Sequence, residues 1–143
     1  LLKKRNERVK PGLDDKILCS WNGLLLNGLT DTYKALHEQE ILITAKQLAE
    51  FLLGKMKVEN KLFHNYKNGK SSITAFLEDY AFLIQGLLNL YEVSLEEKWI
   101  KEAEELTQIV MEEYLDKEEE YFFFTPSSGE KLIARKKEIF DNV

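Results

Sequence analysis

The six residues LLLNGL (Leu24–Leu29) recur 58 positions later as FLIQGL (Phe82–Leu87). The same shift of 58 aligns apolar residues across a second helical pattern further along each segment. These further pairs are Tyr33 with Tyr91, Ile41 with Trp99, Leu42 with Ile100, Ala45 with Ala103, Leu48 with Leu106, and Phe51-Leu52 with Ile109-Val110. Chance similarity rarely holds one register over two separate patterns, so the alignment indicates an internal repeat.

Each repeat predicts two helices of different character. The first, at 14–37 and again at 74–93, is apolar nearly all round and must be covered on most sides. The second, at 41–57 and 96–115, has one apolar stripe and a charged face. A covered helix alternating with an amphipathic one is typical of two concentric layers. We therefore predict an all-α fold, a partial α/α toroid of the six-hairpin glycosidase-like kind, with a plain helical bundle as the alternative.

Two helix starts carry capping signals. Asp14 lies between Leu13 and Leu18 at the spacing of a hydrophobic staple, which predicts an Asp cap for the first helix. Ser94 with Glu97 three residues later predicts a capping box for the last helix.

A short β-hairpin is expected after each second helix. Strand-like runs at 62–67 and 70–73 flank Asn68-Gly69, a strong tight-turn signal, and weaker runs lie at 121–125 and 132–135.

We therefore expect one partial toroid domain over residues 1–143, with repeat one at about 14–73, repeat two at about 74–134 and the start of a third at 135–143. Two and a fraction repeats cannot close a ring, so we expect uncovered inner-helix faces and self-association of the isolated piece.

Composition excludes several function classes. The 143 residues carry 20 Lys and Arg against 25 Asp and Glu, interspersed, with no basic stripe for nucleic acid. Polar residues interrupt every apolar stretch before it reaches the length of a membrane span. The single Cys19 excludes an internal disulfide and fits a reducing, cytoplasmic location. With only His37 and His64 beside it, we expect no metal site, and no phosphate or dinucleotide motif predicts a cofactor.

Three stretches are distinctive: PGLDDKILCSWNGLLLNGL (Pro11–Leu29), AFLEDYAFLIQGLLNLYE (Ala75–Glu92) and RKKEIFDNV (Arg135–Val143). They resemble the bacterial thioredoxin-domain-containing proteins related to spermatogenesis-associated protein 20, over essentially the whole chain. Glu78 departs from the pattern, since that family commonly has Asp there.

The resemblance implies a thioredoxin-like domain followed by a six-hairpin toroid like those of glycosidases and N-acylglucosamine 2-epimerase. This chain would be an internal piece of the toroid, without the thioredoxin-like domain. The remaining hairpins and that domain would be its partners. Cys19 has no CxxC partner, so we expect no redox function from this piece.

Two carboxylates form the best candidate acid/base pair, namely Asp15 and Asp79. Asp79 lies seven residues before Gly86, as Trp21 lies before Gly28, so each pair shares a helix face. In an apolar central cavity Asp79 would suit general acid or base catalysis. Helix–helix contact is the plainer interpretation of the two glycines, and Asp15 is left open between a cavity mouth and a pair with Lys16.

Four further residues are candidates for sugar contacts. Trp21 and Tyr80 could stack on a sugar ring, and core packing is the plainer interpretation of both. Asn22 needs hydrogen-bond partners if it is buried. His64 shares a strand face with Leu62 near the expected rim, where a lone surface histidine is the alternative.

These observations favour a segment of a sugar isomerase, epimerase or glycosidase toroid that binds a sugar ligand and is inactive as an isolated piece. The alternative is a helical-repeat scaffold or protein-interaction module without chemistry. Convergence of Asp15, Asn22, Asp79 and Tyr80 on one concavity would favour the sugar site, whereas separate partners for each would favour the scaffold.

Overall fold

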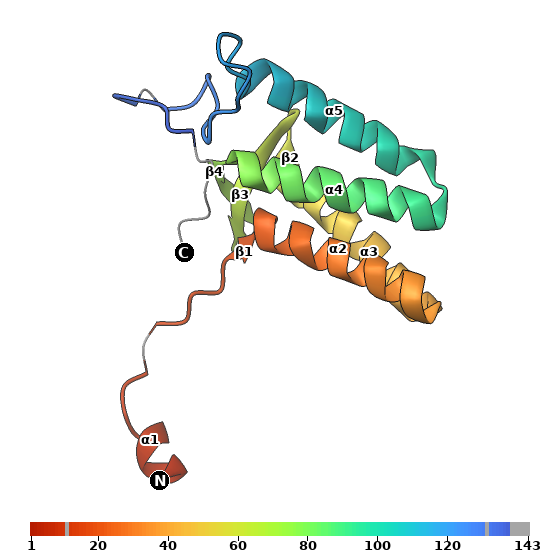
Figure 1. Ribbon diagram of the computed structural model, residues 1–143. Helices are drawn as coiled ribbons and strands as arrows, with labels where there is room; N and C mark the ends of the chain where they lie inside the picture. The colour runs from red at the N-terminus through yellow and green to blue at the C-terminus, as the bar shows by residue number, and fades with distance from the viewer. Residues whose placement is uncertain (11, 131, 138–143) are drawn as a thin grey trace.

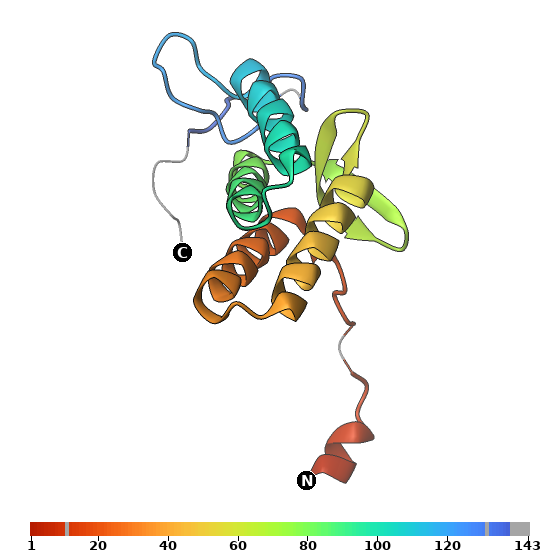
Figure 2. The ribbon, with the colours of Figure 1, turned by 90° about the vertical axis from the view of Figure 1, so that its right-hand side faces the viewer.

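Two helices form the inner layer, α2 (Cys19–Leu36) and α4 (Leu77–Ser94). The computed structural model describes residues 1–10, 12–130 and 132–137. The two inner helices lie side by side and point the same way, each beginning at the end where the β-strands gather (Figure 1). The chain returns along α3 (Gln39–Phe51) after α2 and along α5 (Glu97–Glu113) after α4, so each inner helix has an outer partner (Figure 2). The arrangement is the two-layered one that the sequence predicts.

Both helical hairpins turn at the same repeat position. His37 ends α2 and Leu95 ends α4, and each has a left-handed backbone with φ of 56°. The two residues are 58 positions apart, which is the shift found in the sequence. The tertiary structure therefore repeats the turn as well as the helices.

The sheet is built around one central strand. β3 (Lys61–Lys67) pairs antiparallel with β1 (Ile17–Leu18), β2 (Lys57–Val58) and β4 (Lys70–Thr74). Between β3 and β4, Asn68 and Gly69 have φ of 51° and 79°, as the two-residue hairpin turn requires. The first predicted β-hairpin is confirmed. Because Leu18 pairs with Asn65 in β3, the sheet is fastened to the start of α2.

Three local predictions were wrong. Asp14 does not cap α2, because Ile17 and Leu18 stay extended to pair with β3, and the helix begins only at Cys19. Asp14 instead forms an ion pair with Lys16 at 3.1 Å. The capping box at Ser94 is absent from α5, since the hydroxyl of Ser94 donates to the carbonyl of Leu90 at 2.7 Å.

The second β-hairpin is the third difference. Within the described residues of 121–135 the only pairing is a single bridge from Phe122 to Leu115, and the backbone is otherwise irregular. The N–H of Phe124 donates to the carbonyl of Lys136 instead of to a partner strand. The expected start of a third repeat at 135–143 lies largely outside the described residues.

Other elements add little to the site. A short helix, α1 (Leu2–Asn6), lies at the N-terminus with no buried residue. A π-helical turn, η1 (Leu52–Met56), extends α3 toward β2. None of the helices in the described part of the chain is long and apolar enough to cross a membrane.

The core lies between the inner and outer helices. Its fully buried side chains come from all four main helices, from η1 and from β3, and include Leu26, Ala45, Leu52, Leu62, Leu83, Leu87, Trp99 and Leu106. Two glycines allow the inner helices to approach. A Cβ on Gly23 would lie 2.9 Å from the backbone nitrogen of Leu83, and one on Gly86 would lie 2.8 Å from Cδ2 of Leu26. Gly28, in contrast, faces open space.

Candidate functional site

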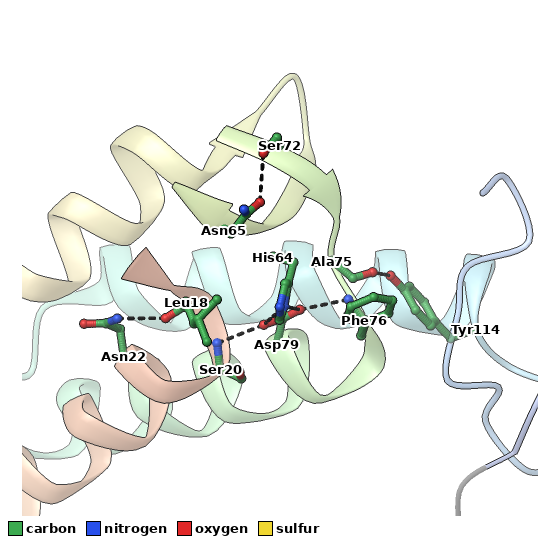
Figure 3. A network of polar contacts seen from close by, with 10 residues as sticks. All are labelled: Leu18, Ser20, Asn22, His64, Asn65, Ser72, Ala75, Phe76, Asp79 and Tyr114. Carbon is green, nitrogen blue, oxygen red and sulfur yellow. Dashed lines mark hydrogen bonds and ion pairs between the residues drawn. The ribbon is translucent and has the colours of Figure 1, made fainter. Parts of the chain in front are cut away.

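The most densely connected polar group is the carboxylate of Asp79, which is fully buried. Its Oδ2 accepts the backbone N–H of Phe76 at 2.9 Å, and its Oδ1 accepts that of Ser20 at 2.8 Å. The imidazole Nδ1 of His64 lies 2.9 Å from Oδ2 and 3.2 Å from Oδ1 (Figure 3). Three separate segments, namely β3 and the first turns of α2 and α4, therefore meet at one side chain.

The position of Asp79 follows from the needs of helix termini. The first N–H groups of a helix have no intrahelical partner, and the helix dipole favours an anion there. Asp79, the third residue of α4, binds back to the N–H of Phe76, the N-cap residue, and also caps the first turn of the neighbouring α2 through Ser20. A buried carboxylate is tolerated only when its oxygens accept hydrogen bonds, and these oxygens accept three donors.

Asp79 also influences its neighbours. Burial raises the pKa of the Cys19 thiol, and the negative charge of Asp79 raises it further. Burial raises the pKa of the Tyr80 hydroxyl against the opposing effect of its hydrogen bond with Leu62, and Cys19, Glu113 and Asp79 add smaller increases. Cys19 is therefore held as a neutral thiol, which removes it as a nucleophile.

His64 is held by Asp79 through one ring nitrogen. When the imidazole is neutral, Nδ1 carries the proton that it donates to the carboxylate, so Nε2 is left as an acceptor. No partner for Nε2 is found among the described residues. The side chain of His64 is 19% exposed, and its ring lies edge-on to Phe76 at 5.0 Å between centroids.

Glu78 brings a third potential ligand close to this pair. One ligand atom each from His64, Glu78 and Asp79 lie within 4.8 Å of one another. Both oxygens of Asp79 and Nδ1 of His64 are already engaged in hydrogen bonds. An ion bound by Nδ1 of His64 would have to displace its hydrogen bond with Asp79.

Trp21 and Asn22 lie together on a different surface. They line a hollow of about 660 Å³ with Leu48 and Phe51. Trp21 is 71% exposed, which is the opposite of the core packing that its helix position favours. The amide of Asn22 donates to the carbonyl of Leu18 at 2.7 Å, so its hydrogen-bonding need is met locally (Figure 3).

Asp15 and Tyr80 each have separate partners. The exposed carboxylate of Asp15 forms an ion pair with Lys67, and the hydrogen bond from that lysine lowers the pKa of Asp15. The buried hydroxyl of Tyr80 accepts the N–H of Leu62 at 3.1 Å, and its ring packs against that of Tyr114. The structure thus brings together Asp79 with His64 and Trp21 with Asn22, without joining the six candidates at one site.

Two partners of Asp79 were missing from the sequence interpretation. Phe76 lies three residues before Asp79, the spacing at which an acidic residue binds back to the N-cap N–H, so this contact had a local signal. The contact with Ser20 spans 59 residues and has no such signal.

This architecture is that of an α/α toroid, seen in several carbohydrate-active proteins. The chain aligns with a cellobiose 2-epimerase of Bacillus thermoamylovorans at a TM-score of 0.72 and 19% identity, over 79% of this chain and 33% of that one. A GH76 α-mannanase of Bacteroides thetaiotaomicron gives a TM-score of 0.67 and 19% identity, over 82% of this chain and 32% of that one. At such identities the likeness establishes the fold alone.

Sequence comparison supplies the family. No protein-family model matches the chain. It is 35% identical over 113 residues to human spermatogenesis-associated protein 20, and 38% identical over 114 residues to an uncharacterised protein of Caenorhabditis elegans. These matches cover 72% and 73% of this chain but only 14% and 16% of the relatives. The chain belongs to the spermatogenesis-associated protein 20 family, as its three distinctive stretches predict. The thioredoxin-like domain of that resemblance stays a prediction.

Proposed function

We propose that this chain supplies part of the wall of a sugar-binding toroid, in which His64 is the group that contacts the sugar. The observation that carries the proposal is the Asp79–His64 pair, with Nδ1 of His64 2.9 Å from the buried carboxylate. The pair lies where the parallel inner helices begin. Sugar epimerases and a glycosidase share this fold, which supports a carbohydrate as the ligand class.

The chemistry of the pair is proton transfer. The carboxylate fixes the tautomer and orientation of the imidazole, so Nε2 can accept a proton from a sugar and return it. Asp79 is fully buried behind three donors, and we assign it the role of a positioning residue. This arrangement replaces the paired carboxylates of Asp15 and Asp79, because Asp15 is engaged by Lys67 at the surface.

We assign Trp21 to a second sugar contact, on a different surface from that of His64. It belongs to the first turn of α2, the same turn that Asp79 binds through Ser20, and its side chain is 71% exposed. An exposed indole offers an apolar face for the C–H groups of a sugar ring. The neighbouring hollow, which Asn22 also lines, leaves room beside it.

The test is a thermal-shift series on the full open reading frame that encodes this chain, against monosaccharides and sugar phosphates. A ligand at 100 times its Kd should stabilise the protein by about 2.7 kcal/mol. We expect the shift to vanish in His64→Gln and to persist in His37→Gln, the matched change at the exposed histidine that ends α2. A shift that survives His64→Gln would overturn the assignment of His64. No shift with any sugar would overturn the sugar proposal.

A second candidate function, a non-catalytic scaffold, is favoured by a specific observation. Asp15, Asn22 and Tyr80 each bind a separate neighbour instead of converging on one concavity. In that case the Asp79–His64 pair serves only to join the sheet to the helices. The same experiment distinguishes the two functions. A scaffold would show no sugar-dependent thermal shift, and Asp79→Asn would lose the same stability with sugar as without it.

A further inference from the structure

One residue of the sheet has a backbone conformation that its side chain disfavours. Ile73, in β4, has φ of 60° and is therefore left-handed. A β-branched residue is a genuine outlier in that region, which glycine adopts without a steric penalty. Strain of this kind persists only where the surrounding structure imposes it, and it gathers at ligand and active sites. The place of Ile73 in the fold therefore bears on function.

The other left-handed residues have a local reason for their conformation. They lie at the ends of helices or in turns, namely His37 and Leu95 after α2 and α4, Glu59 and Asn60 between β2 and β3, Asn68 and Gly69 between β3 and β4, and Glu120 in the turns after α5. Helix ends and tight turns commonly require a left-handed residue. Among the described residues, Ile73 alone has this conformation inside a strand.

The register of the sheet places Ile73 opposite His64. The pairs on either side of them are formed, Phe63 with Thr74 and Asn65 with Ser72. His64 and Ile73 are the one step of the β3–β4 ladder at which no pairing forms. Residues opposite each other on antiparallel strands are close neighbours on one face of the sheet. The strained residue is thus the cross-strand neighbour of the imidazole that we assign to the sugar.

The side chain of Ile73 is exposed at a place where a regular strand would bury it. Ser71, two residues earlier and so on the same face of a regular strand, donates its hydroxyl to the carbonyl of Lys55 in η1. A regular strand would direct Ile73 toward the helices as well. With its left-handed backbone Ile73 is instead 55% exposed, and the neighbouring His64 side chain keeps 19% of its surface exposed.

Neither the strain nor the exposed side chain serves the stability of the fold. Glycine at position 73 would keep the backbone conformation and remove the strain. The Ile73 side chain also does not belong to the hydrophobic core. It does offer an apolar surface to a ligand at His64, and ligand sites combine apolar walls with a few well-placed polar groups.

We propose that Ile73 is an apolar sugar contact that positions the bound ring against Nε2 of His64. This inference rests on the proposed function, because it requires a sugar at His64. The C–H groups of the ring would lie on the Ile73 side chain, which leaves a hydroxyl of the same ring directed at Nε2. Ile73 takes no part in the proton transfer and is a positioning residue.

The test compares stability with binding in Ile73→Gly, made in the full open reading frame that encodes this chain. The probes are D-glucose, D-mannose and their 6-phosphates, with Kd measured by titration calorimetry. Because glycine relieves the strain, the melting temperature without sugar should not fall. Loss of the apolar contact should raise Kd about tenfold. A residue that served only the fold would not give weaker binding at undiminished stability.

Three further variants isolate the side chain. Ile73→Asn, which tolerates the left-handed backbone but is polar, should raise Kd as much as glycine does, and it replaces the glycine variant if that does not fold. Ile73→Leu should restore binding, because it is apolar and of similar size. Leu95→Gly is the matched control, since Leu95 is also apolar, 75% exposed and left-handed with φ of 56°, but lies at the far end of α4. It should leave Kd unchanged.

The outcomes separate this inference from the proposed function. A wild-type response to sugar that is lost in His64→Gln but is unchanged in Ile73→Gly would overturn the Ile73 contact and leave the sugar proposal standing. No response to any of the four sugars would overturn both. A lower melting temperature of Ile73→Gly without sugar would show that Ile73 serves the fold, and would also overturn the inference.

Discussion

The backbone N–H of Ser20 donates to the Asp79 carboxylate at 2.8 Å, so a side chain of the second inner helix caps the first. The same carboxylate binds the N–H of Phe76 and the imidazole of His64. The buried carboxylate of Asp79 therefore holds together the starts of α2 and α4, the sheet and the candidate site. A change that disturbs Asp79 will alter stability and the orientation of His64 together, and experiments must separate the two effects.

Replacing Asp79 by Asn should be strongly destabilising. The amide would turn a donor toward at least one of the N–H groups that the carboxylate now accepts, leaving a buried donor without a partner. We expect the free energy of unfolding to fall by about 3 kcal/mol, measured by urea denaturation. Asp31→Asn, at an exposed position on α2, is the control and should change it by less than about 0.5 kcal/mol. An unfolding free energy unchanged in Asp79→Asn would contradict the capping role.

Two glycines of α2 should respond in opposite directions to the same substitution. Gly23→Ala would place a methyl group 2.9 Å from the backbone of Leu83 and should separate α2 from α4, lowering the melting temperature. Gly28→Ala meets open space inside a helix and should stabilise the monomer by about 1 kcal/mol. Thermal denaturation of both variants at a concentration that keeps them monomeric makes the comparison. Equal effects at the two positions would contradict the close approach at Gly23.

Acid should loosen the segment that follows α5. The hydrogen bond from the Ser127 hydroxyl, helped by that from the Ser128 N–H, lowers the pKa of Glu113 below its ordinary 4.5. Because the folded pKa is the lower one, this contribution is complete above pH 4.5 and is lost as the pH falls through the lowered value. The protection factor of the Ser128 amide, its exchange rate relative to that of an unstructured chain at the same pH, should fall there. Glu113→Gln should remove that pH dependence. A protection factor that stays constant in the wild-type chain would refute the role of Glu113 in holding this segment.

Cys19 should be unreactive until the protein unfolds. Burial, with the charge of Asp79 adding to it, raises the pKa of the thiol, and its side chain has no exposed surface. A thiol reagent at pH 8 should therefore label the native chain slowly and label it rapidly in urea. The labelling midpoint should coincide with the unfolding midpoint followed by circular dichroism. Rapid labelling of the native chain would show that the first turn of α2 opens locally.

The periodic features were predictable because they are local. The shift of 58, the apolar character of the inner helices and the Asn68-Gly69 turn all follow from side-chain spacing, and all appear in the structure. The start of α2 was misplaced by five residues because Asp14 offered a good cap, while pairing of Ile17 and Leu18 with β3 overrode it. Pairing with a strand some 50 residues away cannot be predicted from local capping signals.

The candidate site divides in the same way. The sequence alone identified Asp79 and His64 as candidate site residues, because of their positions in a predicted helix and a predicted strand. Only the tertiary structure joined them, because their contact requires β3 to lie across the starts of two helices. The internal repeat likewise predicted equivalent surroundings for Gly28 and Gly86. In the structure the side chain of Leu26 packs against Gly86, whereas a Cβ on Gly28 would meet open space. The sequence determines which faces are apolar, whereas burial is decided by what packs against each face, and that is a property of the assembled chain.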